Sequence, residues 1–108
     1  MENTYFCPVT ATVSQIGGKW KPIILYLLFQ RKSRFSELKR SIPGITQKML
    51  TQQLRELEQD GIVNREIFPV IPPQVEYSLT EKGQSLSPIL LAMESWGNAN
   101  LRVLAEPV

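Results

Sequence analysis

Residues 44 to 63, GITQKMLTQQLRELEQDGIV, gather side chains of related chemistry on one side of a predicted helix. Leu50, Leu54 and Leu57 recur at positions i, i+4 and i+7, which defines the inward face. The opposite face holds amides, hydroxyls and cations and no carboxylate before Glu56: Gln47, Lys48, Thr51, Gln52 and Arg55. Amides hydrogen-bond to adenine, and cations hydrogen-bond to guanine and phosphate. Hydroxyls hydrogen-bond to either of these two bases. This face therefore has the composition of a surface that reads double-stranded DNA.

The order of charges along this helix runs against its macrodipole. Acidic residues stabilise the start of a helix and basic residues its end, by ~0.3–1 kcal/mol each. Here the cations come first, and Glu56, Glu58 and Asp60 come last, so we expect these acids to lie away from a bound duplex. A helix shaped only for stability would more often have the reverse order. The alternative is a plain solvated face.

Two helices are predicted before this region. Pro8 suits a first helical turn, because its missing N–H would be unpaired there in any case, and Gly17 and Gly18 end that helix. Pro22 begins the second helix in the same way. Residues 23 to 29 are apolar all round, which predicts a helix surrounded by protein.

A short helix and a turn lead into the polar helix. Residues 33 to 35 are enough only for a stub of strand, and Ser36 is expected to cap a helix that ends before Pro43. After the Pro43-Gly44 turn, Thr46 caps the polar helix and Gly61 closes it. The two helices and their turn match the dimensions of a helix-turn-helix.

The second half of the chain predicts a hairpin and one long helix. Residues 74 to 79 alternate between apolar and polar, and residues 62 to 68 form the preceding strand. Three prolines among residues 69 to 73 cannot donate to a ladder, so the tip should protrude as a stiff loop. Thr80 starts the last helix, which Pro88 should kink and whose apolar spacing continues to residue 104. Its apolar band is wider than one small domain covers, which predicts a partner subunit.

These elements predict an α+β, mostly α fold over residues 1–108 as a single domain. It is a winged helix-turn-helix with an extra N-terminal helix and a long C-terminal helix, and the apolar band of the C-terminal helix is available for a dimer interface. The hairpin is the wing, and Arg65 and Gln74 flank its tip as candidate contacts to phosphate or the minor groove. Arg34 and Lys39, with Ser33, are candidate phosphate anchors.

The composition narrows the class of function. Residues 19 to 55 hold nine Lys and Arg against one Glu, although the net charge of the chain is only +2, which favours a polyanionic partner. The chain has no His, the commonest metal ligand and general base, so we expect no metal, no cofactor and no enzymatic activity. The longest apolar run is too short for a membrane span, and no signal peptide is evident. A reducing cytoplasm fits a single Cys best.

Cys7 is the one side chain outside the polar helix whose chemistry stands out. It would lie at the N-cap of the first helix if Pro8 is the first helical residue. The helix dipole favours a thiolate there, and the thiolate is the reactive form. An oxidant or electrophile could then switch the protein. The alternative is that Cys7 is a small packed hydrophobe.

Three separated stretches resemble the HxlR-type family of bacterial transcription regulators: CPVTATVSQIGGKW, RFSELKRSIPGITQKMLTQQLRELEQDGIV and PPQVEYSLTEKGQSLSPIL. The resemblance runs from Cys7 to about Leu101. It implies a winged-helix fold, a homodimer built from the first and last helices, and binding to palindromic operator DNA. It places Thr46, with the five polar residues above, on the recognition helix, and Val70–Pro73 on the wing tip.

The resemblance also bears on the thiol. Cys7 matches the family's N-terminal Cys before Pro, which in some members is a thiol sensor of quinones, aldehydes or oxidants. Because this chain has no second Cys, a disulfide would join two copies of Cys7 or a small thiol, and alkylation is a rival chemistry. The resemblance assigns no effector.

The sequence thus predicts a dimeric DNA-binding regulator whose recognition helices enter successive major grooves, ~34 Å apart. Two other classes stay open. A winged-helix interaction module without DNA binding would need an exposed apolar patch on the helix within residues 44 to 63. A small thiol enzyme using Cys7 would need a base to activate it, and the chain has no His.

Overall fold

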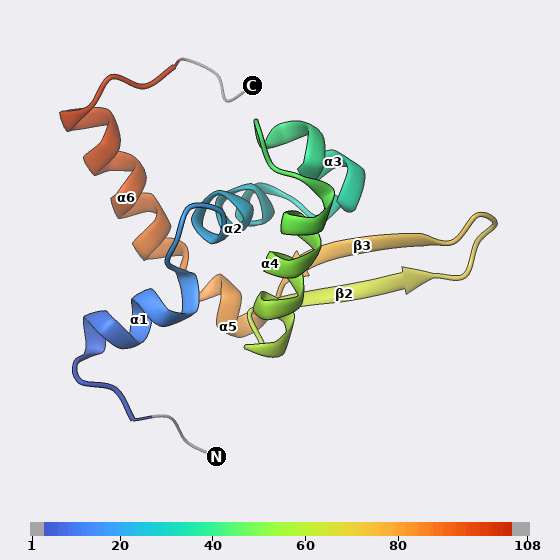
Figure 1. Cartoon of the computed structure of the whole chain (residues 1–108), viewed down its shortest axis with the longest axis horizontal. Coiled ribbons are helices and arrows are strands. Elements are labelled where there is room, and N and C mark those ends of the chain that lie inside the picture. The colour runs from blue at the N-terminus through green and yellow to red at the C-terminus, as the bar shows by residue number, and fades with distance from the viewer. Residues whose placement is uncertain (1–3, 105–108) are drawn as a thin grey trace.

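A computed structural model describes residues 4–104, which form helices around a small antiparallel sheet (Figure 1). The elements in chain order are α1 (Pro8–Ile16), α2 (Lys21–Gln30), β1 (Ser33–Arg34), α3 (Phe35–Ser41), α4 (Gln47–Gln59), β2 (Val63–Phe68), β3 (Gln74–Leu79), α5 (Glu81–Gln84) and α6 (Ser87–Asn100). The predicted α+β class and winged helix-turn-helix order are confirmed.

The first two helices begin where the prolines indicated. Cys7 is the N-cap of α1, and its sulfur accepts the backbone N–H of Thr10. Gly17 ends this helix, and Pro22 lies in the first turn of α2. The apolar residues of α2 are buried or half-buried, which confirms a helix surrounded by protein.

Helices α3 and α4 form the helix-turn-helix. Gly44 in the turn between them has φ 82°, in the left-handed region that favours glycine. The Thr46 hydroxyl caps α4 by accepting the backbone N–H of Met49 at 3.0 Å. Gly61, at φ 74°, follows the end of the helix. The predicted boundaries of this helix are therefore confirmed.

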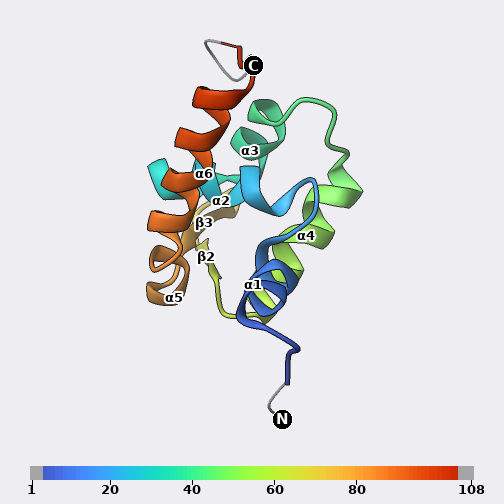
Figure 2. The ribbon, with the colours of Figure 1, turned by 90° about the vertical axis from the view of Figure 1, so that its left-hand side faces the viewer.

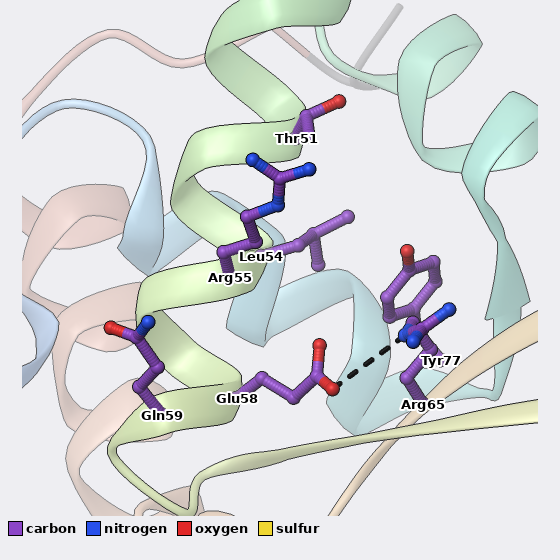
Figure 3. A pocket seen from close by; sticks show the side chains of 7 residues that line it. All are labelled: Thr51, Leu54, Arg55, Glu58, Gln59, Arg65 and Tyr77. Carbon is purple, nitrogen blue, oxygen red and sulfur yellow. Dashed lines mark ion pairs between the residues drawn. The ribbon is translucent and has the colours of Figure 1, made fainter.

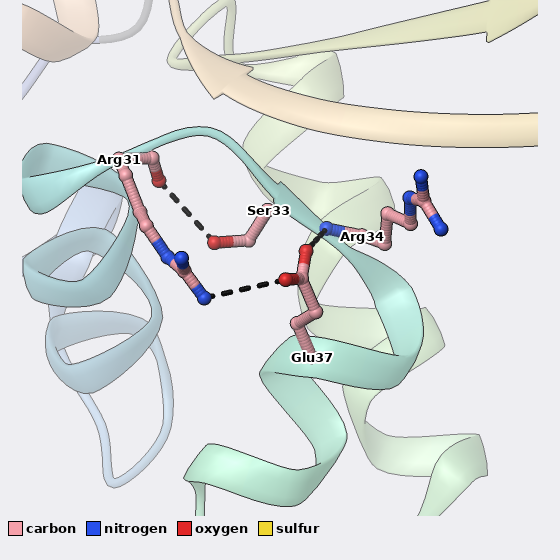
Figure 4. Close-up of polar contacts among 4 residues, drawn as sticks. All are labelled: Arg31, Ser33, Arg34 and Glu37. Atoms are coloured by element: carbon pink, nitrogen blue, oxygen red, sulfur yellow. Dashed lines mark hydrogen bonds and ion pairs between the residues drawn. The ribbon is translucent and has the colours of Figure 1, made fainter.

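The start of α3 differs from the prediction that Ser36 caps it. The helix begins at Phe35, and its N-cap is Arg34, whose backbone N–H donates to the Glu37 carboxylate at 2.8 Å (Figure 4). A carboxylate at the third helical position reaches back to the N-cap more readily than a serine already inside the first turn. Half-buried Phe35 also packs against the core from this position.

The hydrophobic core lies between α2, the helix-turn-helix and the base of the hairpin. The inward stripe of α4 is fully buried, as its spacing predicted. The buried core residues are Ile16, Ile24, Leu25, Leu28, Leu38, Ile42, Ile45, Leu50, Leu54, Leu57, Ile62, Val63 and Leu90. The recognition helix candidate is therefore held rigidly by its inner face and leaves its outer face to solvent.

The sheet has the order β1-β3-β2, with both pairs antiparallel. The register pairs Val63 with Leu79 and Phe68 with Gln74, so the tip comprises residues 69 to 73. The β2–β3 hairpin extends far beyond the helices (Figure 1). The expected alternation of burial in β3 is absent, since all six of its residues are half-buried. As the central strand, β3 has neighbours on both edges as well as helices beside it.

The predicted single last helix is two helices. Thr80 caps the short α5, and the helix is interrupted at Ser85 and Leu86 before α6 begins. Pro88 lies in the first turn of α6, where its missing N–H costs nothing, so the helix restarts instead of kinking. Helix α6 ends at Asn100, and the apolar residues 101, 103 and 104 lie beyond it.

Helices α1 and α6 lie at the end of the molecule opposite the hairpin tip (Figures 1 and 2). Both expose large apolar side chains, among them Val9, Val13, Met93 and Trp96. The large Trp96 side chain belongs to a residue that is 63% exposed. Within residues 4–104, no helix combines the length and hydropathy that a membrane span needs.

Candidate nucleic-acid interface

The outer face of α4 carries the polar side chains that the sequence assigned to it. Gln47, Lys48, Gln52 and Arg55 are exposed, and Thr51 is half-buried. The Thr51 hydroxyl donates to the carbonyl of Gln47, one helical turn earlier, at 2.8 Å. That hydroxyl proton is therefore engaged, and Thr51 has its oxygen lone pairs left to accept a hydrogen bond. Thr46 is exposed at the start of the helix but serves as its cap.

Glu56 is closer to this face than the sequence suggested. Its carboxylate accepts from the Gln52 amide nitrogen at 3.2 Å and lies 2.7 Å from the Lys21 ammonium of α2. The hydrogen bonds from Lys21 and then Gln52 hold the pKa of Glu56 below its ordinary value. One helical turn brings residues i and i+4 together, so Glu56 adjoins the polar face through Gln52.

A cleft of about 450 Å³ separates α4 from the hairpin (Figure 3). The lining residues are Thr51, Leu54, Arg55, Glu58, Gln59, Arg65 and Tyr77. Arg65 Nε lies 3.6 Å from Glu58 Oε1, so the pair joins β2 to α4 across the cleft. Burial of Tyr77 raises the pKa of its phenol. The cleft thus presents cations from both a helix and a strand beside a half-buried aromatic ring.

The two candidate wing residues, Arg65 and Gln74, lie at different distances from the tip of the hairpin. Gln74 pairs with Phe68 next to the tip, whereas Arg65 pairs with Tyr77 nearer the base. The prediction that Arg65 flanks the tip is therefore wrong, because β2 continues for three residues beyond it. Its guanidinium faces Glu58 of α4 instead.

The candidate phosphate anchors are divided by their exposure. Arg34 is exposed, and its guanidinium points away from Glu37 (Figure 4). Lys39 is also exposed, on α3. Ser33 is only 5% exposed, and its hydroxyl donates to the carbonyl of Arg31 at 3.3 Å. Ser33 is thus turned inward and is not an anchor, because pairing with β3 directs its side chain to the core. The Arg31 guanidinium is held at 3.2 Å by Glu37.

Comparison with known proteins agrees with this architecture. A family model described as HxlR-like helix-turn-helix matches residues 15–104. The chain belongs to the HxlR-like family. The transcriptional regulators of this family bind DNA through a winged helix, and the resemblance seen in the sequence is confirmed.

Individual HxlR-like relatives match over most of the chain. YybR, an HTH-type transcriptional regulator of Bacillus subtilis (strain 168), is 57% identical over 98 residues, covering 91% of this chain and 78% of YybR. The solved structure of the redox regulator HypR in its oxidized form matches with a TM-score of 0.86 at 57% identity, covering 90% of this chain and 100% of that chain. The reduced form of the transcriptional regulator YodB from B. subtilis matches with a TM-score of 0.75 at 38% identity, covering 89% and 95%.

Cys7 of this HxlR-like chain is the N-cap of α1, and α1 lies at the opposite end of the molecule from the wing (Figure 1). Its sulfur accepts the Thr10 backbone N–H at 3.3 Å and lies 3.1 Å from the Thr10 hydroxyl oxygen. These two contacts, the hydroxyl first, lower the pKa of the Cys7 thiol. The thiol is only partly covered, so a small reagent can reach it.

Sequence reasoning missed Tyr77 and Lys21 of the candidate interface, and it did not predict the partner of Glu58. The place of Tyr77 beside Arg65 depends on the register of the hairpin, which the alternating pattern of residues 74 to 79 does not specify. Glu58 and Lys21 carried no motif of their own. One signal in the sequence could have predicted part of this arrangement, the i, i+4 spacing of Gln52 and Glu56. That spacing predicts the contact between these two side chains but not the ion pair of Glu56 with Lys21.

Proposed function

We propose that this chain is a sequence-specific transcription regulator that acts in the cytoplasm as a homodimer on a palindromic operator. Helix α4 enters the major groove, and the β2–β3 hairpin lies against the backbone. One observation carries the proposal: the exposed outer face of α4 is lined with amides, hydroxyls and cations and is backed by a buried leucine stripe. Base edges in the major groove require these donors and acceptors.

The apolar surface of α1 and α6 supports the homodimer. Val9 and Val13 of α1 and Ile89 and Met93 of α6 line one cleft of about 460 Å³. Trp96 continues the exposed apolar surface along α6. Monomeric proteins rarely leave such a continuous patch in water. A twofold axis through this end would leave both wings outward and both copies of α4 free to meet half-sites ~34 Å apart.

Phosphate contacts supply much of the affinity in this arrangement. Arg34, Lys39 and Lys48 are exposed cations on β1, α3 and α4, and Arg65 adds an exposed cation on β2 that is paired with Glu58 of α4. Each phosphate neutralised releases condensed counterions, so affinity should fall steeply with salt. Base contacts from α4 then determine which sequence is chosen.

The test begins with selection of bound fragments from the source genome, followed by titration of the selected operator. Arg55→Ala should weaken binding, and Gln52→Ala should relax base preference by about 1–3 kcal/mol at one position. Arg102→Ala removes the same charge beyond α6 and serves as the control, with affinity unchanged. If Arg55→Ala and Gln52→Ala both leave the titration unchanged, α4 does not read DNA.

Modification of Cys7 is the switch that we propose for this regulator. The N-cap position, the hydrogen bonds from Thr10 and the lowered pKa all favour the thiolate. HypR and YodB have been solved in redox-defined forms, and HypR is described as a redox regulator. An unsaturated carbonyl would add to the sulfur at its β-carbon, and the proton would end on the α-carbon. A bulky adduct there adjoins the apolar surface of α1 and alters the dimer.

The proposed switch has a direct test. Operator binding is titrated before and after treatment with a quinone or with diamide, in the wild type and in Cys7→Ser. We expect the wild type to change its affinity and Cys7→Ser to ignore both reagents. A disulfide between two copies of Cys7 would pass two electrons to diamide and would appear as a covalent dimer, whereas a quinone adduct adds mass to each subunit. An equal response in both proteins would remove Cys7 from the regulation.

No observation favours the two other classes. Among the described residues, the exposed large hydrophobic side chains lie on the N-terminal segment, α1, the hairpin, α6 and the segment after it, and none lies on α4. An interaction module would need such a patch on α4. The polar partner of Cys7 is the hydroxyl of Thr10, which is not a base that could activate a thiol enzyme.

A further inference from the structure

We propose that Glu56 fixes the orientation of the Gln52 amide and thereby makes Gln52 a reader of adenine. This inference rests on the proposed function, in which α4 enters the major groove. It adds a positioning residue to the helix and names the base that one contact selects. It is carried by a chain of three side chains, Lys21, Glu56 and Gln52, that joins α2 to the outer face of α4.

The two oxygens of the Glu56 carboxylate have different partners. Oε1 lies 2.7 Å from the Lys21 ammonium, and Oε2 accepts from Gln52 Nε2 at 3.2 Å. The Lys21 side chain is only 10% exposed and comes from the first turn of α2, which is part of the core. Glu56 is therefore anchored from outside its own helix, and its second oxygen has a set position beside Gln52.

The chemistry of this contact decides which way the amide faces. An ionised carboxylate accepts hydrogen bonds and donates none. The NH₂ group of Gln52 must therefore face Glu56, because the amide oxygen would meet a second acceptor there. The Lys21 and Gln52 hydrogen bonds lower the pKa of Glu56, so the carboxylate stays ionised at neutral pH. The assignment of amide oxygen and nitrogen, often ambiguous in proteins, is thus determined by Glu56.

The amide keeps one donor and one acceptor for DNA. One N–H of the amide is engaged by Glu56, which leaves the carbonyl oxygen and the second N–H. Adenine offers the complementary pair in the major groove, a donor at N6 and an acceptor at N7. Guanine offers two acceptors, N7 and O6, so the held carbonyl oxygen would face O6 without a hydrogen. A freely turning amide could instead direct its NH₂ group to guanine.

The experiment measures operator affinity with each of the four bases at every position of the selected site. The wild type should prefer adenine over guanine by roughly tenfold at one position of each half-site. Gln52→Ala should abolish the preference at that position. Glu56→Gln should reduce it several-fold and leave the other positions unchanged, because a second amide can present either its oxygen or its NH₂ group. Glu81→Gln, with the same change of charge on α5, should keep the wild-type pattern.

Loss of the ion pair could also disturb the fold, so a second variant is included. Lys21→Met combined with Glu56→Gln removes both charges and leaves no unpaired ammonium. It should show the same relaxed preference as Glu56→Gln. Independently of any variant, the side-chain amide resonances of Gln52 in the free wild type should shift as the Glu56 carboxyl is titrated.

The outcomes separate this inference from the proposed function. If the wild type binds DNA without any base preference, the proposed function fails. If Gln52→Ala changes one position but Glu56→Gln keeps the full adenine preference there, the function stands and the role of Glu56 is refuted. A guanine preference at that position, or Gln52 amide resonances that ignore the titration of Glu56, would refute it equally.

Discussion

The sulfur of Cys7 lies 3.1 Å from the hydroxyl oxygen of Thr10 and also accepts the backbone N–H of that residue. The thiol thus takes the place of the usual serine or aspartate at a helix N-cap. Both contacts stabilise a negative sulfur more than a neutral thiol, which is why they lower the pKa of Cys7. The reactivity of the thiol is therefore set by its own helix.

Thr10→Val should raise the pKa of Cys7, since the hydroxyl is the largest cause of its lowering. Less thiolate would be present at neutral pH, so alkylation by iodoacetamide should slow several-fold, and its rate should rise at higher pH than in the wild type. Thr12→Val is the matched control, because the Thr12 hydroxyl donates to the Pro8 carbonyl and does not touch the sulfur. Identical rate–pH profiles for the wild type and Thr10→Val would contradict this account.

Acid should weaken the contact between Lys21 and Glu56. A carboxyl whose pKa is lower in the folded state adds stability that is fully present above its unfolded value, about pH 4.5, and is lost as the pH falls through the folded value. Glu56→Gln should therefore lower the free energy of unfolding by about 1 kcal/mol near neutral pH, a modest value because Glu56 stays partly exposed. Urea unfolding of both proteins should show this difference shrinking below about pH 4.5. A difference that grows in acid would reject the pair as its source.

Trp96→Glu should dissociate the proposed homodimer. The indole is 63% exposed on α6, and a charge in its place could not be buried against a second subunit. Analytical ultracentrifugation should find a monomer where the wild type is a dimer. Ile71→Glu puts the same charge on a fully exposed apolar residue of the hairpin tip and should leave the dimer intact. A dimer that survives Trp96→Glu would place the subunit contact elsewhere.

Gly83→Ala should destabilise the fold where α5 meets the start of the hairpin. A Cβ at this position would lie 2.3 Å from the backbone carbonyl oxygen of Ile62, and neither backbone can move freely. We expect a loss of about 1–3 kcal/mol in thermal or urea unfolding. Gly97→Ala makes the same change inside α6, where, apart from the neighbouring residues and backbone of its own helix, no atom of residues 4–104 lies within 4 Å of the added Cβ. It should be neutral or slightly stabilising. Equal stability of the two variants would contradict the close approach.

The sequence by itself determined the helix boundaries at Pro8, Thr46 and Gly61, and the division of α4 into a leucine stripe and a polar face. Capping and helical periodicity depend on residues within about four positions of one another, so they can be recognised in a single chain. The same local patterns supported the resemblance to the HxlR-like family.

Only the tertiary structure decided the partners of these residues. Lys21 meets Glu56 from another helix, Arg65 turns to Glu58 instead of the hairpin tip, and Ser33 is directed inward. These contacts join separate elements, so they depend on strand register and helix packing that no local pattern specifies. The interruption between α5 and α6 was also decided by the tertiary structure. Helix α5 packs closely against the base of the hairpin at Gly83, and α6 then starts as a separate helix.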